Sequence, residues 1–198
     1  AAYRLVDHFG WTELIYGHLT ARVPGEQAHF LINPFGLNYD EVTASNLVKI
    51  DLQGRIVGDS RWPVNPAGFV VHSAIHQGIE DAHCVMHTHT TTGMAVACLK
   101  DGLSPHNFYG AMLQGQIAYH DFEGVTVRDE EGERLLANLG DKRVMLLRNH
   151  GILAQPAIIR PLVEAGCLMQ VTAGSLIGAF GPASQRCTGS GLCASGNS

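Results

Sequence analysis

Short strand-like runs of apolar residues and longer runs with helical spacing follow one another along the chain. The short runs predict strands at residues 18–24, 29–34, 47–58, 84–89, 116–123, 124–128, 142–148 and 152–154. The runs with helical spacing predict helices at residues 1–9, 66–78, 91–99, 129–140 and 156–180. This interleaving of strands and helices predicts an α/β fold.

Local signals mark the expected ends of several elements. Asn65 followed by Pro66 is typical of a helix N-terminus, because the asparagine side chain caps the first turn and proline fits there without losing a hydrogen bond. Gly10 is placed to end the first helix. The pair Gln53-Gly54 inside the third strand-like run predicts a hairpin.

The chain has 198 residues, which is long enough for one domain with a full hydrophobic core. It contains no internal repeat and no dividing linker, so residues 1–180 are predicted to form one domain. Residues 181–198 are rich in glycine and serine, and we expect an irregular tail there. Apolar residues make up 45% and charged residues 16%, a balance that favours a compact enzyme-like domain.

The charge and cysteine content narrow the classes of partner and compartment. The formal net charge is −5 and no run is rich in lysine or arginine, so neither a nucleic acid nor an anionic membrane has electrostatic support as a partner. No stretch approaches the roughly 18–20 apolar residues of a membrane span, and no secretory signal is visible. The five cysteines contain no CxxC pair and are odd in number, which argues against a disulfide framework. We therefore expect a cytoplasmic protein.

The segment CVMHTHTTTG, residues 84–93, raises the question of a metal site. If it begins as a strand, His87 and His89 project from the same face, roughly 6–7 Å apart at the backbone, and can close around one ion. His150 follows an apolar strand and precedes a glycine, at the kind of strand end where α/β sites are built. Three neutral imidazoles with an open position would make a catalytic-type zinc site. The alternative is that these are surface or hydrogen-bonded core histidines, because short motifs are often accidental.

His72 and His76 form a rival pair, four residues apart on one face of the predicted 66–78 helix. No glutamate follows His72 as it would in an HExxH zinc motif. We therefore interpret this pair as structural.

The segments YGHLTARVP, LINPFGL, NPAGFVVHSAIH, HTHTTTG and RNHGIL occur in this order along the chain. Through these motifs the chain resembles the class II aldolase/adducin family, from Ala1 to about Ala154. The resemblance implies a three-layer α/β/α fold with a central, mainly antiparallel sheet. It also implies assembly as a homotetramer with C4 symmetry, and a small-molecule substrate.

The resemblance further implies a divalent metal ion, most often zinc, held by His87, His89 and His150 near a subunit interface. In the sugar-phosphate aldolases of the family, the ion polarises the substrate carbonyl and stabilises the enediolate formed by C–C cleavage, while a glutamate moves the proton. Because all three ligands are imidazoles, Mn, Fe or Co remain alternatives to zinc.

Departures from the family pattern fall at the proton carrier and at the phosphate site. Gly68 stands where these aldolases have the glutamate, and Pro66-Ala67 stand where they have a serine pair that helps to hold phosphate. In the loop that resembles their Gly-Asn-x-Ser phosphate loop, the asparagine is replaced by His18. The NPFG segment keeps its glycine, Gly36. Gly36 and Gly68 are thus predicted at the substrate-binding site.

Loss of a general acid/base usually costs about 10²–10⁴ in rate, and a glycine cannot transfer a proton. His18 and Tyr109 are the predicted catalytic residues. Other titratable side chains near the matched segments are His120, Asp121 and Glu123. A hydroxide on the metal is an alternative proton carrier, because zinc lowers the pKa of its water to roughly 7.

Three functions remain open. The first is a metal-dependent lyase that acts on a non-phosphorylated hydroxy- or keto-carbonyl compound, by aldol cleavage or decarboxylation. The second is a non-catalytic scaffold or binding module like the head of adducin, which also lacks the glutamate. The third is an oxygenase with non-haem iron, although iron more often has two histidines and one carboxylate. The intact set of three ligand histidines favours the lyase.

Overall fold

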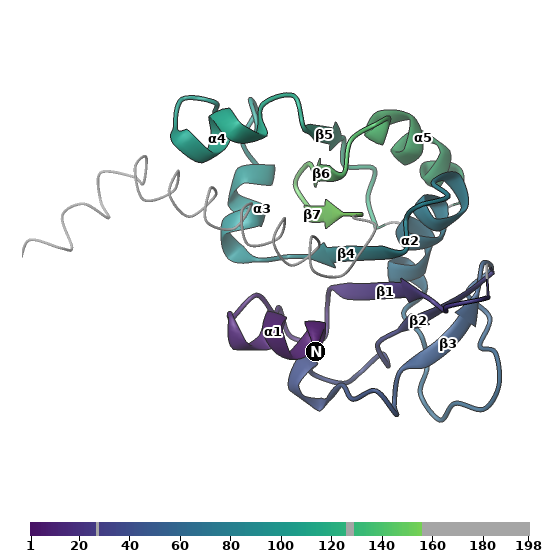
Figure 1. Cartoon of the computed structure of the whole chain (residues 1–198). Helices are drawn as coiled ribbons and strands as arrows, with labels where there is room; N and C mark the ends of the chain where they lie inside the picture. The colour runs from purple at the N-terminus through teal and green to yellow at the C-terminus, as the bar shows by residue number, and fades with distance from the viewer. Residues whose placement is uncertain (27, 126–128, 156–198) are drawn as a thin grey trace, which may run out of the picture.

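A single seven-stranded sheet organises the protein (Figure 1). The computed structural model describes residues 1–26, 28–125 and 129–155. The strands run in the order β3-β2-β1-β4-β7-β6-β5, and every neighbouring pair is antiparallel except β5 with β6. Their bounds are β1 His18–Arg22, β2 His29–Ile32, β3 Val48–Asp51, β4 Cys84–Thr88, β5 Ile117–His120, β6 Val144–Leu147 and β7 Gly151–Ala154. The expected mainly antiparallel sheet is confirmed.

Helices cover both faces of this sheet. The helices of the described residues are α1 Ala2–His8, η1 (a 3₁₀ turn) Tyr39–Glu41, α2 Pro66–Gly78, α3 Thr91–Ala97, α4 Phe108–Leu113 and α5 Asp129–Leu139. Figure 1 shows α1 and α3 on one side of the strands and α2 and α5 on the other. This arrangement gives the three layers expected of the α/β/α fold.

The alternation of side chains along each strand separates two cores. In β4, Val85 points toward α2 and α5, where it packs with Ile75 and Leu135. Its neighbour Met86 points to the opposite face and packs with Val6 of α1. By the same alternation, His87 shares the face of Val85, so it lies on the α2 side of the sheet.

Helix α2 begins where the sequence predicts. Asn65 is its N-cap, the Asn65 side chain accepts a hydrogen bond from the Ala67 N–H at 3.1 Å, and Pro66 is in the first turn. Gly10 follows α1 with a φ of +65°, a left-handed conformation that glycine adopts easily. The predicted hairpin appears as a bridge between Ile50 and Ile56 beyond β3.

Other local predictions were less accurate or fall outside the described residues. The sequence did not predict α4, because its six residues are too few to show a helical period and include a glycine. Within the predicted strand 124–128, residues 124–125 form a bend, and 126–128 lie outside the described residues. The predicted helix at 156–180 and the tail at 181–198 also lie outside them.

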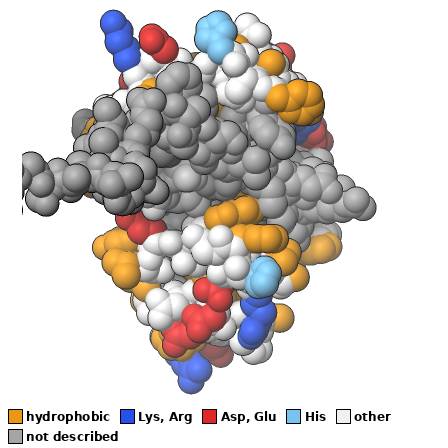
Figure 2. Space-filling model, turned by 90° about the vertical axis from the view of Figure 1, so that its left-hand side faces the viewer, with side chains coloured by type: hydrophobic (Ala, Val, Ile, Leu, Met, Phe, Trp, Pro, Cys, Tyr) orange, Lys and Arg blue, Asp and Glu red, His pale blue; other side chains and the backbone are white. Residues whose placement is uncertain are grey.

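The described surface carries charges of both signs. On the face drawn in Figure 2, acidic and basic side chains lie near one another, and the coloured side chains form no continuous basic patch. In the part of the chain that the structure describes, every helix is too short or too polar to cross a bilayer.

Candidate metal centre

Three histidines from distant parts of the chain meet beside the ends of β4 and β7. His87 lies in β4, His89 follows that strand, and His150 lies in the turn between β6 and β7. One ligand nitrogen from each lies within 4.8 Å of the other two. The ring centroids of His87 and His89 are 4.7 and 4.8 Å from that of His150. The structure therefore brings together all three residues that the sequence singled out as ligands.

Hydrogen bonds fix which nitrogens of this triad carry protons. A carbonyl oxygen can only accept, so His87 Nδ1, which lies 3.0 Å from the Ile152 oxygen, must donate. His89 Nδ1 lies 2.8 Å from a Glu13 carboxylate oxygen and donates to it. In neutral imidazoles the two Nε2 atoms are then both unprotonated, and they face each other at 2.7 Å. Two lone pairs at that distance repel, and a bound cation would relieve the repulsion, so this donor set fits a metal ion.

The turn that carries His150 explains the Asn-His-Gly motif. Asn149 has a φ of +55°, a left-handed conformation that asparagine tolerates better than most residues. The Asn149 N–H donates to the Ala97 carbonyl at 3.1 Å, which ties the turn to α3. A Cβ on Gly151 would lie 2.6 Å from the Thr88 oxygen and 3.0 Å from the His89 ring. Only glycine lets β7 approach the histidines so closely.

Burial keeps His87 and His150 in the neutral form that metal ligands require. Desolvation, followed by the neighbouring histidines, lowers the pKa of His87 well below its ordinary value. The same causes, with burial again the largest, lower the pKa of His150 to about 4. Near neutral pH these imidazoles have lone pairs available for a cation.

His18 and Gly68 form one structural unit beside the triad. The buried His18 ring has its centroid 5.1 Å from that of His87. A Cβ on Gly68 would lie 2.3 Å from His18 Cδ2 and 2.4 Å from His18 Nε2. The imidazole of His18 therefore occupies the volume in which any side chain at position 68 would begin.

The other predicted substrate and catalytic residues lie in different settings. Gly36 is in an exposed turn with a φ of +100°, and no described contact joins it to the triad. Tyr109 belongs to α4, but its side chain is outside the described part of the structure.

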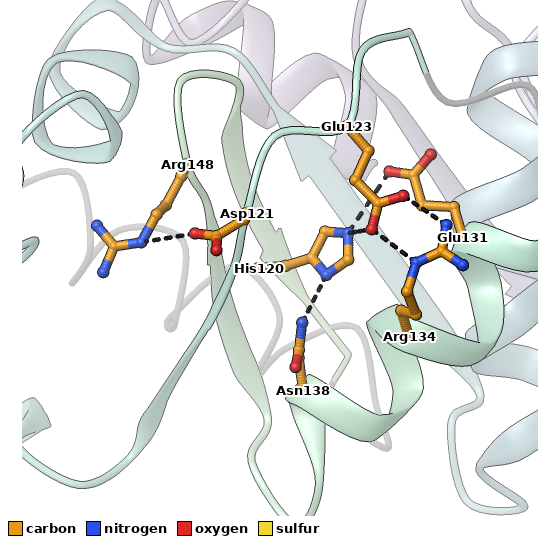
Figure 3. A network of polar contacts seen from close by, with 7 residues as sticks. All are labelled: His120, Asp121, Glu123, Glu131, Arg134, Asn138 and Arg148. Atoms are coloured by element: carbon orange, nitrogen blue, oxygen red, sulfur yellow. Dashed lines mark hydrogen bonds and ion pairs between the residues drawn. The ribbon is translucent and has the colours of Figure 1, made fainter.

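His120, Asp121 and Glu123 belong to a polar network along β5 and α5 (Figure 3). Asn138 Nδ2 donates to Nδ1 of the buried His120 at 2.8 Å. His120 Nε2 faces a Glu131 oxygen at 3.5 Å and a Glu123 oxygen at 3.9 Å. The remaining charges are paired within the network, Glu123 with Arg134 at 2.8 Å and Asp121 with Arg148 at 3.3 Å.

This network borders the candidate metal centre at one point. A small cavity is lined by His120, Phe122 and His150, and His120 contributes to the lowered pKa of His150. A larger groove of about 740 Å³ lies elsewhere, between α2 and α5, and Phe69, Gln77 and Leu136 line it without any triad residue. The volume of that groove therefore does not identify the site.

Glu13 is the residue of this centre that the sequence reasoning missed. It lies 76 positions from its partner His89, in a segment without strand or helix periodicity. Nothing in the local sequence distinguishes this glutamate from a solvated one. The neighbouring Leu14 has a φ of +48°, so an uncommon backbone conformation accompanies its placement.

Comparisons with known proteins agree with this fold and site. The family model "Class II Aldolase and Adducin N-terminal domain" matches residues 1–158. Alpha-adducin of Rattus norvegicus is 52% identical over 157 residues, which make up 78% of this chain but only 21% of alpha-adducin. The chain thus spans about a fifth of that relative.

Two solved structures are also similar. An aldolase II superfamily protein from Pseudomonas syringae has 47% sequence identity and a TM-score of 0.87, with 90% of this chain and 72% of that chain covered. An L-fuculose 1-phosphate aldolase from Glaciozyma antarctica PI12 has 27% sequence identity and a TM-score of 0.79. The match covers 89% of this chain and 69% of that chain.

Proposed function

Since the chain belongs to the class II aldolase and adducin family, we propose that it is a metal-dependent lyase. Its substrate is a non-phosphorylated hydroxy- or keto-carbonyl compound, which it splits by aldol cleavage or decarboxylation. The metal is zinc, which suits a set of three imidazole ligands, and its ligands are His87, His89 and His150. Similarity to an L-fuculose 1-phosphate aldolase supports the reaction class.

One observation carries this proposal. The unprotonated Nε2 atoms of His87 and His89 face each other at 2.7 Å, with their Nδ1 atoms held by Ile152 and Glu13. In metal sites, a ligand histidine usually donates a hydrogen bond from its outer nitrogen to a carbonyl or carboxylate, which fixes the orientation of the ring. When bound, a divalent ion supplies a Lewis acid that polarises a substrate carbonyl.

The change at the phosphate site supports a substrate without phosphate. Pro66 has neither an N–H nor a hydroxyl to offer, and Ala67 has no hydroxyl. The N–H of Ala67 already donates to the Asn65 side chain at 3.1 Å. The first turn of α2 therefore has few donors left for a phosphate group, compared with a serine pair at the same positions.

Aldol cleavage also needs a base for the substrate hydroxyl proton. As this proton leaves, the C–O bond becomes a carbonyl, the adjacent C–C bond breaks, and the second fragment receives the electron pair and then a proton. We assign the movement of this proton to His18, whose ring lies over Gly68 and next to His87. Tyr109 remains the second candidate.

Elemental analysis of protein purified without added metal tests the metal assignment. We expect one divalent ion per chain in the wild type and in His106→Ala, a control at an exposed histidine, and almost none in His89→Ala. Turnover of a panel of hydroxy-keto acids, each with and without a phosphate group, then tests the reaction. A wild type without stoichiometric metal, or a preference for phosphorylated substrates, would contradict the proposal.

The similarity to alpha-adducin favours a second candidate function, a non-catalytic binding module. Such a module has no need for metal or turnover. Metal-free wild-type protein that is fully folded and binds no added zinc would support this second function over the lyase.

We further propose that the protein is a cytoplasmic homotetramer, as the family resemblance implies. Sedimentation analysis should then give a particle of four times the 21.3 kDa chain mass. A monomer at micromolar concentration would contradict this proposal.

A further inference from the structure

A continuous chain of hydrogen bonds runs from His18 into the interface between β1 and α2. His18 Nδ1 lies 2.8 Å from His72 Nε2, and His72 Nδ1 lies 2.7 Å from the Thr20 hydroxyl oxygen. The same hydroxyl oxygen lies 2.7 Å from His76 Nε2, and His76 Nδ1 lies 2.7 Å from the Ala82 carbonyl oxygen. The four side chains that form this series of hydrogen bonds are at most 6% exposed, namely His18, Thr20, His72 and His76.

The far end of the chain fixes the position of every proton in it. The Ala82 carbonyl can only accept, so His76 Nδ1 carries a proton and donates it. Burial lowers the pKa of His76 to about 4, so the ring is neutral near pH 7 and its Nε2 is an acceptor. Thr20 has a single hydroxyl proton, and that proton must therefore point to His76 Nε2.

The same reasoning continues from Thr20 to the candidate metal centre. With its proton used, the Thr20 oxygen accepts from His72 Nδ1. His72 is buried, with its pKa lowered well below the ordinary value, so its Nε2 is unprotonated and accepts from His18 Nδ1. A neutral His18 ring then has its proton on Nδ1 and a lone pair on Nε2.

The lone pair on His18 Nε2 has no partner among the residues that the structure describes. This atom lies over Gly68, where a Cβ would be only 2.4 Å away, and its ring lies beside His87. A substrate hydroxyl that reached the triad would thus meet an acceptor and not a donor.

We propose that His72, Thr20 and His76 are positioning residues that hold His18 as its Nδ1–H tautomer and so present an unprotonated Nε2 to the substrate hydroxyl. His72 and His76, which the sequence suggested were structural, then act on the reaction through His18. The tautomer follows from the hydrogen bonds between neutral, buried rings, whereas its catalytic consequence rests on the lyase function proposed above.

Nuclear magnetic resonance of ¹⁵N-histidine-labelled protein tests the tautomers without any variant or substrate. Protonated and unprotonated imidazole nitrogens differ widely in ¹⁵N shift and in their couplings to the ring protons. We expect His18, His72 and His76 all to have a protonated Nδ1 and an unprotonated Nε2. An Nε2–H tautomer at His18 in the wild type would overturn the proposal.

Substitution of Thr20 tests whether its hydroxyl controls the tautomer of His18. In Thr20→Val, His72 loses its acceptor, so His18 should populate the Nε2–H tautomer, whereas Thr20→Ser should keep the wild-type spectrum. Ser73→Ala is the matched control, because the Ser73 hydroxyl on α2 donates to the Val70 carbonyl and takes no part in the hydrogen bonds between His18 and His76. An unchanged His18 tautomer in folded Thr20→Val would overturn the proposal, and the wild-type spectrum decides the question if that variant does not fold.

Kinetics separate a failure of this proposal from a failure of the lyase function. Thr20→Val should lower kcat about 10-fold with little change in KM, less than the roughly 10²–10⁴ expected when a general base is removed as in His18→Ala. Thr20→Ser should restore kcat. If no substrate turns over, the lyase function fails while the spectra still test the tautomers. Turnover that depends on His18 but not on Thr20 would overturn the positioning role.

Discussion

Individual hydrogen bonds decide the chemistry of this centre. Of the three triad histidines, Glu13 contacts only His89 in the described structure. Its carboxylate fixes the proton of His89 on Nδ1, and His89 Nε2 then faces His87. A carboxylate in that position also makes the imidazole a stronger electron donor. Glu13 therefore contributes to the proposed metal site without being a ligand.

Replacing Glu13 by glutamine should weaken zinc binding by about 10- to 100-fold, the usual cost of altering the group that orients a ligand histidine. The amide can still accept from His89 Nδ1 but carries no negative charge. Competition with a zinc chelator measures the affinity. Glu80→Gln is the control, because Glu80 is an exposed glutamate that has no contact with the triad in the described part of the chain. Equal affinities in both variants would show that Glu13 is not part of the site.

The His18 ring fills the space that a side chain at position 68 would need. A family aldolase has a glutamate at the second position, whereas here a Cβ would lie 2.3 Å from the His18 ring. The two positions cannot both carry large side chains. The departure at Gly68 and the departure at His18 are therefore one coupled change.

This coupling predicts that Gly68→Glu and His18→Asn are strongly non-additive. Gly68→Glu alone should destabilise the protein by roughly 1–3 kcal/mol through overpacking. Adding His18→Asn should recover part of this loss, with a coupling free energy of about 0.5–3 kcal/mol. Urea unfolding of the four proteins gives the coupling. Ala67→Glu combined with His18→Asn is the control pair, and additivity at both pairs would refute the steric link.

At the scale of elements, the first turn of α2 positions the histidine chain. Asn65 caps the helix through a 3.1 Å hydrogen bond, and His72 and His76 follow about two and three turns later on the face toward β1. A displaced helix start would move both imidazoles relative to Thr20. In the proposed mechanism the cap thus also helps to position His18.

Asn65→Ala should lower the free energy of unfolding by about 1 kcal/mol, the typical cost of losing an N-cap. Asn65→Ser should stay near the wild type, because serine also accepts from the helix N–H groups. Thermal unfolding followed by circular dichroism compares the three proteins. A loss in the serine variant equal to that in the alanine variant would show that the cap hydrogen bond is not the cause.

The elements that the sequence predicted well are those with long periodic patterns or explicit end signals. Helix α2 has thirteen residues, an asparagine cap and an early proline, and its observed bounds match the prediction. Helix α4 has six residues and η1 only three, so neither shows a period that could be recognised. Sequence pattern therefore predicts the framework better than its short connections.

Some residues of the candidate site could also be predicted from the sequence, and others could not. His87, His89 and His150 were predictable because short motifs at strand ends carry them. Glu13 was not, because its contact with His89 spans 76 positions and arises only when the fold is complete. The hydrogen bonds of His72 and His76 to Thr20 were also hidden, since a helical spacing of four does not show what lies on the facing strand.

At the scale of the whole molecule, the number of buried histidines is the dominant feature. His18, His72, His76 and His87 are all at most 6% exposed, and burial is the first cause of a lowered pKa in each. Hydrogen bonds to Lys49 and Arg143 lower the pKa values of the half-buried Glu26 and the exposed Asp81 below the ordinary carboxyl range. The window from pH 5 to 6.5 therefore reports on the histidines.

Metal-free protein should lose stability as the pH falls through this window. The unfolded chain takes up protons near pH 6.5, the ordinary pKa of histidine, whereas folded His76 takes one up only near its pKa of about 4. The contribution of the buried histidines to the free energy of unfolding is thus complete above pH 6.5. It is lost as the pH falls toward 4, at up to about 1.4 kcal/mol per pH unit for each histidine.

Urea unfolding in the presence of a chelator at pH 7.0, 6.0 and 5.0 measures this dependence. The slope of the unfolding free energy between pH 6 and 5 should correspond to several protons, and His76→Gln should reduce it by about one. Saturating zinc should raise stability at pH 7, because binding requires neutral imidazoles. A free energy of unfolding that is flat from pH 7 to 5 would mean that these histidines are not held neutral by the fold.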